Sequence, residues 1–184
     1  IIYGLFDHAY RKTFFNLNDI KIAQTNRQAG FEDILVRDNG YEFVHKAEGF
    51  EWYKPKGCKN GYTRIAIGDE YIIICADTLD DVLSQQEIAK QLAGNSAIQT
   101  VSNLLWQKPP LPEFTSLWFL VLKDQETERW LDTNHLELNN LTPREVLQQE
   151  DGHKKLTKLL DDFSSAVHTS EETELIEYMK MRIQ

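Results

Sequence analysis

Two apolar runs separated by a glycine constrain the fold of this chain most strongly. Residues 62–67 read Tyr-Thr-Arg-Ile-Ala-Ile, and residues 71–76, after Gly68 and Asp69, read Tyr-Ile-Ile-Ile-Cys-Ala. Runs rich in β-branched and aromatic residues are typical of β-strands, and a short connection that contains glycine joins them as a hairpin. We expect Gly68 to supply the first turn position, where glycine tolerates a positive φ. The second run is apolar on both faces, which predicts a strand that is central in a sheet or covered on both sides.

A second hairpin is predicted earlier in the chain. Residues 34–36 are apolar, Asn39 and Gly40 follow, and an aromatic-rich run covers residues 41–43. Asn-Gly between apolar runs is a strong hairpin signal, because both residues tolerate a positive φ. Residues 50–53 are typical of a further strand. Together these runs predict an antiparallel meander of four or five strands.

A helix is predicted to begin after Thr78. The Thr78 hydroxyl can accept hydrogen bonds from the free amides of the first turn, and the carboxylates of Asp80 and Asp81 are favourable beside the positive end of the helix dipole. Gly94 is a suitable C-terminal stop. We expect this helix to cover one face of the sheet. Residues 96–106 are compatible with either a second helix or a strand.

A proline-rich segment indicates a domain boundary. Residues 107–113 contain three prolines, which favour a stiff, extended conformation. We therefore predict an α+β domain over residues 1–106, which includes a short amphipathic helix over residues 6–17. A Pro-rich linker over residues 107–113 and a helical domain over residues 114–184 follow.

The last third of the chain carries helix starts and apolar stripes. Thr142 can cap a helix, Pro143 fits the first helical position, and Glu145 can complete a capping box. Gly152 predicts an interruption. Apolar residues then recur at helical spacing in two further helices, as Leu156, Leu159, Leu160 and Phe163 and as Leu175, Ile176, Met179 and Ile183. The predicted fold class is α+β, an antiparallel β-meander covered by a helix and followed by a small C-terminal helical region.

Composition argues against several classes of function. The 184 residues carry a formal net charge of −9, and an acidic surface repels the phosphates of nucleic acids. No apolar run approaches the roughly 20 residues that a membrane-spanning helix needs. Cys58 and Cys75 form no CxxC pair, which favours a reducing compartment. We therefore expect a soluble, cytoplasmic protein. Its first residues lack a methionine and the layout of a signal peptide, so the sequence is compatible with a piece of a longer chain.

No pattern in the sequence indicates a self-contained catalytic or metal site. The histidines do not have the spacing of metal ligands, and GxSxG, Walker and GxGxxG motifs are absent. Cys58 lies among lysines that would favour its thiolate, but no histidine is beside it in sequence. We expect no cofactor and no metal, and we interpret the chain as a protein without catalytic activity, with an enzymatic alternative left open.

A stretch near the C-terminus matches a family pattern. Residues 129–133 read Arg-Trp-Leu-Asp-Thr, Leu138 follows, residues 141–147 read Leu-Thr-Pro-Arg-Glu-Val-Leu, and Gly152 precedes the leucines of residues 156–160. This order resembles the C-terminal toxin-binding domain of MbcA/ParS/Xre-type antitoxins. It also resembles the tail of bacterial proteins that carry a SEC-C metal-binding motif.

The resemblance covers roughly residues 126–163. Asn139 and Asn140 stand where the family has glycines, and asparagine also tolerates the left-handed backbone conformation. The family implies a helical platform whose exposed face engages another protein, in some cases a toxin. The residues that we expect to form a small core and to contribute to partner binding are Trp130, Leu131, Leu138, Leu141, Pro143, Arg144 and Leu147.

These observations predict a non-catalytic protein-interaction module that is antitoxin-like and belongs to a bacterial stress or defence system. Its partner would be another protein, such as a toxin or an enzyme, and neither a membrane nor a nucleic acid is expected. Two alternatives remain open. One is an acidic mimic of a nucleic acid. The other is an enzyme, or an accessory domain of an enzyme, with a site between the sheet and the helical region that is lined by His45, Trp52, Tyr53, Cys58 and Trp106.

Overall fold

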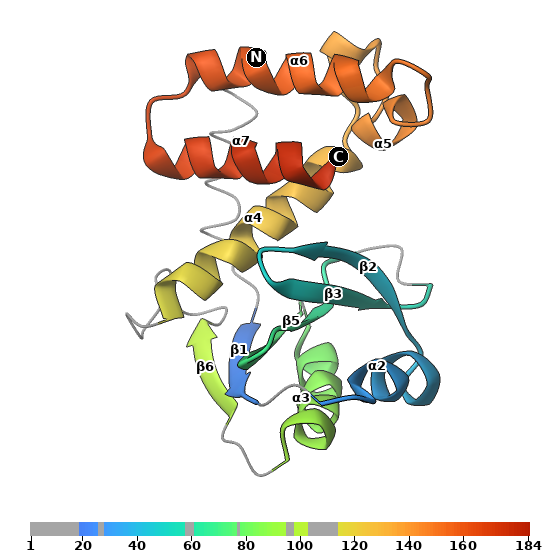
Figure 1. Ribbon diagram of the computed structural model, residues 1–184, viewed down its shortest axis with the longest axis vertical. Coiled ribbons are helices and arrows are strands. Elements are labelled where there is room, and N and C mark those ends of the chain that lie inside the picture. The colour runs from blue at the N-terminus through green and yellow to red at the C-terminus, as the bar shows by residue number, and fades with distance from the viewer. Residues whose placement is uncertain (1–18, 26–27, 58–60, 77, 95–97, 103–113) are drawn as a thin grey trace. The chain divides into compact units, whose positions relative to one another are not determined.

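The protein has an α+β fold in which an antiparallel sheet precedes a set of helices (Figure 1). The computed structural model describes residues 19–25, 28–57, 61–76, 78–94, 98–102 and 114–184. The predicted helix over residues 6–17 and the predicted linker over residues 107–113 lie outside the described residues. The chain divides into two compact units, one over Asn16–Trp118 and one that includes Phe119–Gln184.

The first unit contains a six-stranded antiparallel sheet with the strand order β2-β3-β4-β5-β1-β6. The strands are β1 (Asp19–Gln24), β2 (Tyr41–Ala47), β3 (Phe50–Pro55), β4 (Arg64–Ile67), β5 (Tyr71–Ala76) and β6 (Ile98–Ser102). Strands β2 to β5 form the predicted meander, and β1 and β6 extend it beyond β5. The interior position predicted for residues 71–76 is confirmed, because β5 pairs with a neighbour on each side and five of its six residues are buried.

The β4–β5 hairpin is confirmed, but its glycine is needed for a different reason from the one expected. The Gly68 amide donates a hydrogen bond to the Tyr71 carbonyl at 2.9 Å, which closes the connection. The φ of Gly68 is not positive. A Cβ at Gly68 would instead lie 2.8 Å from Cε1 of Phe50. Glycine therefore makes room for a neighbouring aromatic ring.

The hairpin predicted around Asn39 and Gly40 is wrong. The chain before it forms α2 (Phe31–Asp33) and a π-helical turn, η1 (Ile34–Asp38), which places the buried Phe31 and Leu35 on one side. The Asn39 side chain donates a hydrogen bond to the Ile34 carbonyl at 2.6 Å, and Gly40 has a φ of 70°. Asn-Gly therefore ends a helix here, because the same tolerance of positive φ serves both a hairpin and a helix terminus.

Helix α3 (Leu79–Ala93) covers one face of the sheet, as predicted. It lies beside β5 in Figure 1. The Thr78 hydroxyl accepts a hydrogen bond from the Asp81 amide at 3.2 Å, and Gly94, with a φ of 63°, ends the helix. The core between helices and sheet consists of Phe31, Leu35, Tyr41, Tyr53, Ile65, Ile67, Ile72, Ile74, Ile88, Ala89 and Leu92.

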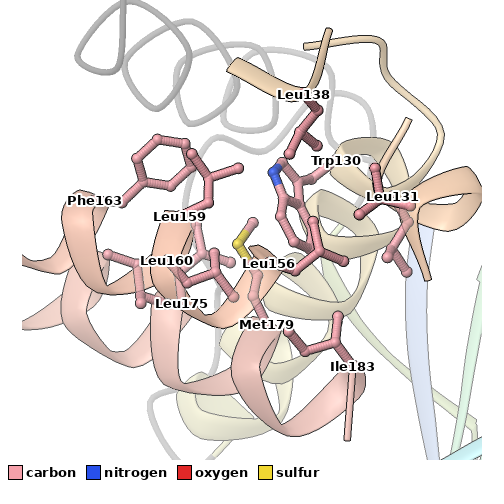
Figure 2. Packing of buried hydrophobic residues seen from close by; sticks show 12 residues of the cluster. Trp130, Leu131, Leu138, Leu156, Leu159, Leu160, Phe163, Leu175, Met179 and Ile183 are labelled. Carbon is pink, nitrogen blue, oxygen red and sulfur yellow. The ribbon is translucent and has the colours of Figure 1, made fainter. Parts of the chain in front are cut away.

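The second unit is helical. Its elements are most of α4 (Thr115–Leu131), then η3 (Leu136–Leu138), α5 (Pro143–Val146), α6 (Gly152–Ala166) and α7 (Ser170–Arg182). The two apolar stripes predicted after Gly152 fall on α6 and on α7 with Ile183 directly after it, and both face one core (Figure 2). No helix in the described part of the chain combines the length and apolar character that crossing a bilayer requires.

Candidate functional site

Most of the apolar residues predicted to bind a partner belong to the core of the helical unit. Trp130 lies among side chains from η3, α6 and α7, including Leu138 and Leu156 (Figure 2). Trp130, Leu131 and Leu138 are 4%, 3% and 8% exposed, respectively. Leu147 is half-buried and packs against the same core. These residues therefore belong to the core of the helical unit, and among the buried ones Leu138 also lines a surface groove.

A tight loop brings the chain from α4 to α5. His135 is buried, and its amide donates a hydrogen bond to the Leu141 carbonyl at 3.1 Å. Asn139 and Asn140 both have positive φ values, 55° and 62°. These two asparagines therefore adopt the left-handed conformation that was expected where the family has glycines. The loop holds Leu141 beside the core.

Helix α5 begins with the predicted capping box. The Thr142 hydroxyl accepts a hydrogen bond from the Glu145 amide at 3.1 Å, and the Glu145 carboxylate accepts one from the Thr142 amide at 2.8 Å. Pro143 is buried at the first helical position, where no amide donor is needed. These contacts fix the direction of a helix that is too short to be stable alone.

Gly152 is the first residue of α6 and lies against the end of α5. A Cβ at this position would lie 1.8 Å from the Val146 carbonyl oxygen. The predicted interruption is confirmed, since α5 ends at Val146 and α6 starts at Gly152. Its physical cause is the close approach of two backbone segments.

The loop, α5 and α6 enclose a groove on the surface of the helical unit, which we call the Leu138 groove. Its volume is about 410 Å³. The residues that line it are Glu137, Leu138, Asn139, Leu141, Val146, Gln149, Lys155, Lys158, Leu159 and Asp162. Four of them are apolar and pack in or against the core, whereas the others are polar or charged. Leu138 and Leu141 are the predicted partner-binding residues that the structure brings together here.

Arg144, which was also predicted to bind a partner, lies in a network of ion pairs. Its guanidinium donates to the Asp132 carboxylate at 2.8 Å and to the Glu128 carboxylate at 3.1 Å. Arg182, at the end of α7, donates to Glu128 at 2.6 Å and to Asp124 at 2.9 Å. The network therefore ties α5 and α7 to α4.

Burial sets the protonation properties of this network. Tyr178 donates a hydrogen bond to Asp124 at 2.6 Å. Burial, followed by the charge of Asp124, raises the pKa of Tyr178 far above its usual value. Burial lowers the pKa of Arg182, but the charges of Asp124 and Glu128 outweigh this effect, so the pKa is raised overall. The tyrosine stays neutral and the arginine stays charged, as a structural network requires.

The residues of the enzymatic alternative do not all gather on one side of the sheet. The rings of His45 and Trp52 stack with their centroids 5.6 Å apart. Tyr53 is adjacent in β3, and it belongs to the core on the α3 face of the sheet. Cys58 and Trp106 lie outside the described residues. Within the described part of the chain, no three His, Cys, Asp or Glu residues cluster as metal ligands would.

Comparison with protein-family models, with curated proteins and with solved structures found no match for this chain. What the protein does is therefore inferred from its own residues. Among the features described above, the Leu138 groove is the one that combines exposed charge with an apolar floor.

Proposed function

We propose that this chain is a protein-interaction module with an antitoxin-like role, and that the Leu138 groove is its docking surface. The observation that carries the proposal is the composition of the groove. Leu138, Leu141, Val146 and Leu159 form an apolar floor, and charged residues surround it. Protein interfaces have this arrangement, in which an apolar centre supplies most of the affinity and a polar rim supplies orientation.

The groove suits an apolar side chain that projects from another polypeptide. Its floor is continuous with the core that Trp130 organises, so the floor is held in place before a partner arrives. Preorganisation of this kind lowers the entropic cost of binding. On the rim, Lys155 and Lys158 are three residues apart on α6 and therefore lie on the same side of the helix. Lys155 is paired with Asp151 at 3.1 Å, so it is Lys158 that favours a partner segment with a carboxylate beside its apolar anchor.

The resemblance to antitoxin toxin-binding domains supports the same proposal. The residues that form the floor fall within the stretch that resembles those domains, roughly residues 126–163. In that family the helical platform engages another protein. We therefore propose that the partner is a protein, such as a toxin or an enzyme, and that the chain takes part in a bacterial stress or defence system.

Site-specific photocrosslinking tests the proposal in the native host. Gln149 lines the groove and is exposed, whereas its neighbour Gln148 is exposed and does not line it. With p-benzoylphenylalanine at position 149, we expect a discrete crosslinked product that contains a protein other than this chain. The same label at position 148 should give little of this crosslinked product. Equal products from both positions, or none from position 149, would contradict the proposal.

A charge reversal on the rim completes the test. Lys158→Glu should reduce the crosslinked product, and Lys154→Glu is the matched control, because Lys154 is exposed on the same helix and does not line the groove. Both variants change the net charge of −9 by the same amount, so a general electrostatic effect would reduce the crosslinked product equally in the two. An equal loss in the two variants would count against a specific docking surface.

A further inference from the structure

Leu136 is an apolar side chain that projects from the surface next to the Leu138 groove. It is 72% exposed, compared with 52% for Phe43 and 51% for Leu83, the other exposed large hydrophobic residues in the described part of the chain. It is the first residue of η3, and the two residues after it, Glu137 and Leu138, line the groove. An isolated exposed leucine is ordinary. Leu136, however, lies beside a groove with an apolar floor, and such a groove can bury a leucine side chain.

We infer that the Leu138 groove receives Leu136 from a second copy of this chain, in a two-fold symmetric pair. The inference rests on the proposed function, in which the groove is a docking surface, and it names one occupant. In a two-fold interface each copy offers the same patch and receives the same patch. Because Leu136 and the groove are adjacent on one surface, a single axis allows both contacts to form at once.

Lys158 is the rim charge that fits this occupant. Lys155 is paired with Asp151 at 3.1 Å. Glu137, Lys158 and Asp162, which also lines the groove, make no ion pair with any residue that the structure describes. Glu137 directly follows Leu136, so insertion of Leu136 carries this carboxylate to the rim of the second copy. There Lys158 provides the opposite charge.

The overall charge of the protein opposes association of two copies. Two copies that each carry a formal net charge of −9 repel one another at long range. The pairing of Glu137 with Lys158, which occurs twice in a symmetric dimer, offsets part of this repulsion at the interface. The same pairing covers the groove, so a different protein has to displace the second copy before it can dock.

Sedimentation equilibrium of the full chain tests the inference. We expect the wild-type protein to reach the mass of two chains as its concentration rises. Each leucine that is no longer buried should weaken the affinity about tenfold or more. A symmetric pair contains two copies of Leu136, so Leu136→Asp should raise the dissociation constant about 100-fold or more. Leu83→Asp is the matched control, and it should leave the dissociation constant unchanged. Both leucines are exposed, so neither change should unfold the protein, and circular dichroism verifies this.

A charge exchange gives a second, independent readout. Glu137→Lys and Lys158→Glu should each weaken the pair, whereas the double variant restores opposite charges and should recover the wild-type mass. A wild-type chain that has the mass of one copy up to about 1 mM, the limit of weak association, overturns the inference. A dimer that survives Leu136→Asp, or a double variant that fails to recover, overturns it as well. A monomeric chain that still crosslinks a different protein from position 149 leaves the proposed function standing.

Discussion

Replacing Arg182 with methionine removes a guanidinium that joins the last helix to α4. Arg182 donates to Asp124 at 2.9 Å and to Glu128 at 2.6 Å, and the three side chains are 6%, 0% and 12% exposed, respectively. Methionine keeps most of the volume of the arginine stem, so packing changes little. The change therefore isolates the loss of charge.

The expected cost follows from burial. Hydrogen bonds to charged groups contribute about 1.5–3 kcal/mol each. Removing one partner of a buried ion pair costs about 3–5 kcal/mol, because the other charge stays buried without compensation. Asp124 keeps the hydrogen bond from Tyr178 at 2.6 Å, so its carboxylate is not left without a donor. Glu128 likewise keeps the Arg144 guanidinium at 3.1 Å. We therefore expect Arg182→Met to destabilise the helical unit by about 3 kcal/mol, the lower end of this range and still a large part of the total stability of a domain.

Hydrogen exchange measured on peptides from α7 reports this loss within the helical unit. Since about 1.4 kcal/mol corresponds to a factor of ten, exchange through unfolding should become about 100-fold faster or more. Arg37→Met is the control, because Arg37 pairs with its neighbour Asp38 and its side chain is 72% exposed. Exposed pairs contribute about 0–1 kcal/mol. An effect of Arg182→Met no larger than that of Arg37→Met would refute the structural role of the network.

Three further predictions concern stability. Because burial and then Asp124 raise the pKa of Tyr178, the neutral form is favoured on folding, and this contribution is lost as pH rises above about 10, by about 1.4 kcal/mol per pH unit. Urea unfolding at alkaline pH should show this slope, and Tyr178→Phe should remove it. Gly152→Ala places a methyl group 1.8 Å from the Val146 carbonyl oxygen, so thermal unfolding should show a loss of about 1–3 kcal/mol or more. Thr142→Ala removes a cap and should cost about 0.5–2 kcal/mol in the same assay, whereas Thr142→Ser should cost less.

The parts of the fold that the sequence predicts well depend on nearby residues. The caps at Thr78 and Thr142 each involve a contact three residues away, with Asp81 and Glu145. The β4–β5 hairpin likewise joins two strands through Gly68 and two further residues. Such features can be read within a short window, since the groups that stabilise them lie inside it.

The wrong prediction of a hairpin at Asn39 and Gly40 shows where a short stretch of sequence is insufficient to predict the local structure. The same two residues can close a hairpin or end a helix, and the choice depends on the segment before them. Phe31 and Leu35 are four residues apart and both are buried, which is the spacing of a helix facing a core. That spacing is present in the sequence, but the β-branched residues around Leu35 obscure it.

The network around Arg182 illustrates a different limit. Asp124 and Glu128 on α4 and Asp132 directly after its end recur every four residues, so the sequence does place three carboxylates along one side. The arginines that neutralise them lie 12 to 58 residues away. Only the packing of α5 and α7 against α4 determines which cations meet this face. The Leu138 groove likewise depends on how helices pack, because the residues that line it come from η3 and its loop, α5 and α6.

Arg144 shows why the docking surface has to be tested at its rim. Arg144 is half-exposed, with its side chain 49% accessible, yet it anchors α5 through Asp132 and Glu128. Helix α5 carries Val146 into the floor of the groove, so a change at Arg144 would alter the shape of the groove as well as any direct contact. Loss of a partner in such a variant would have two explanations. Lys158 forms no ion pair within the described chain, and a change there separates recognition from folding.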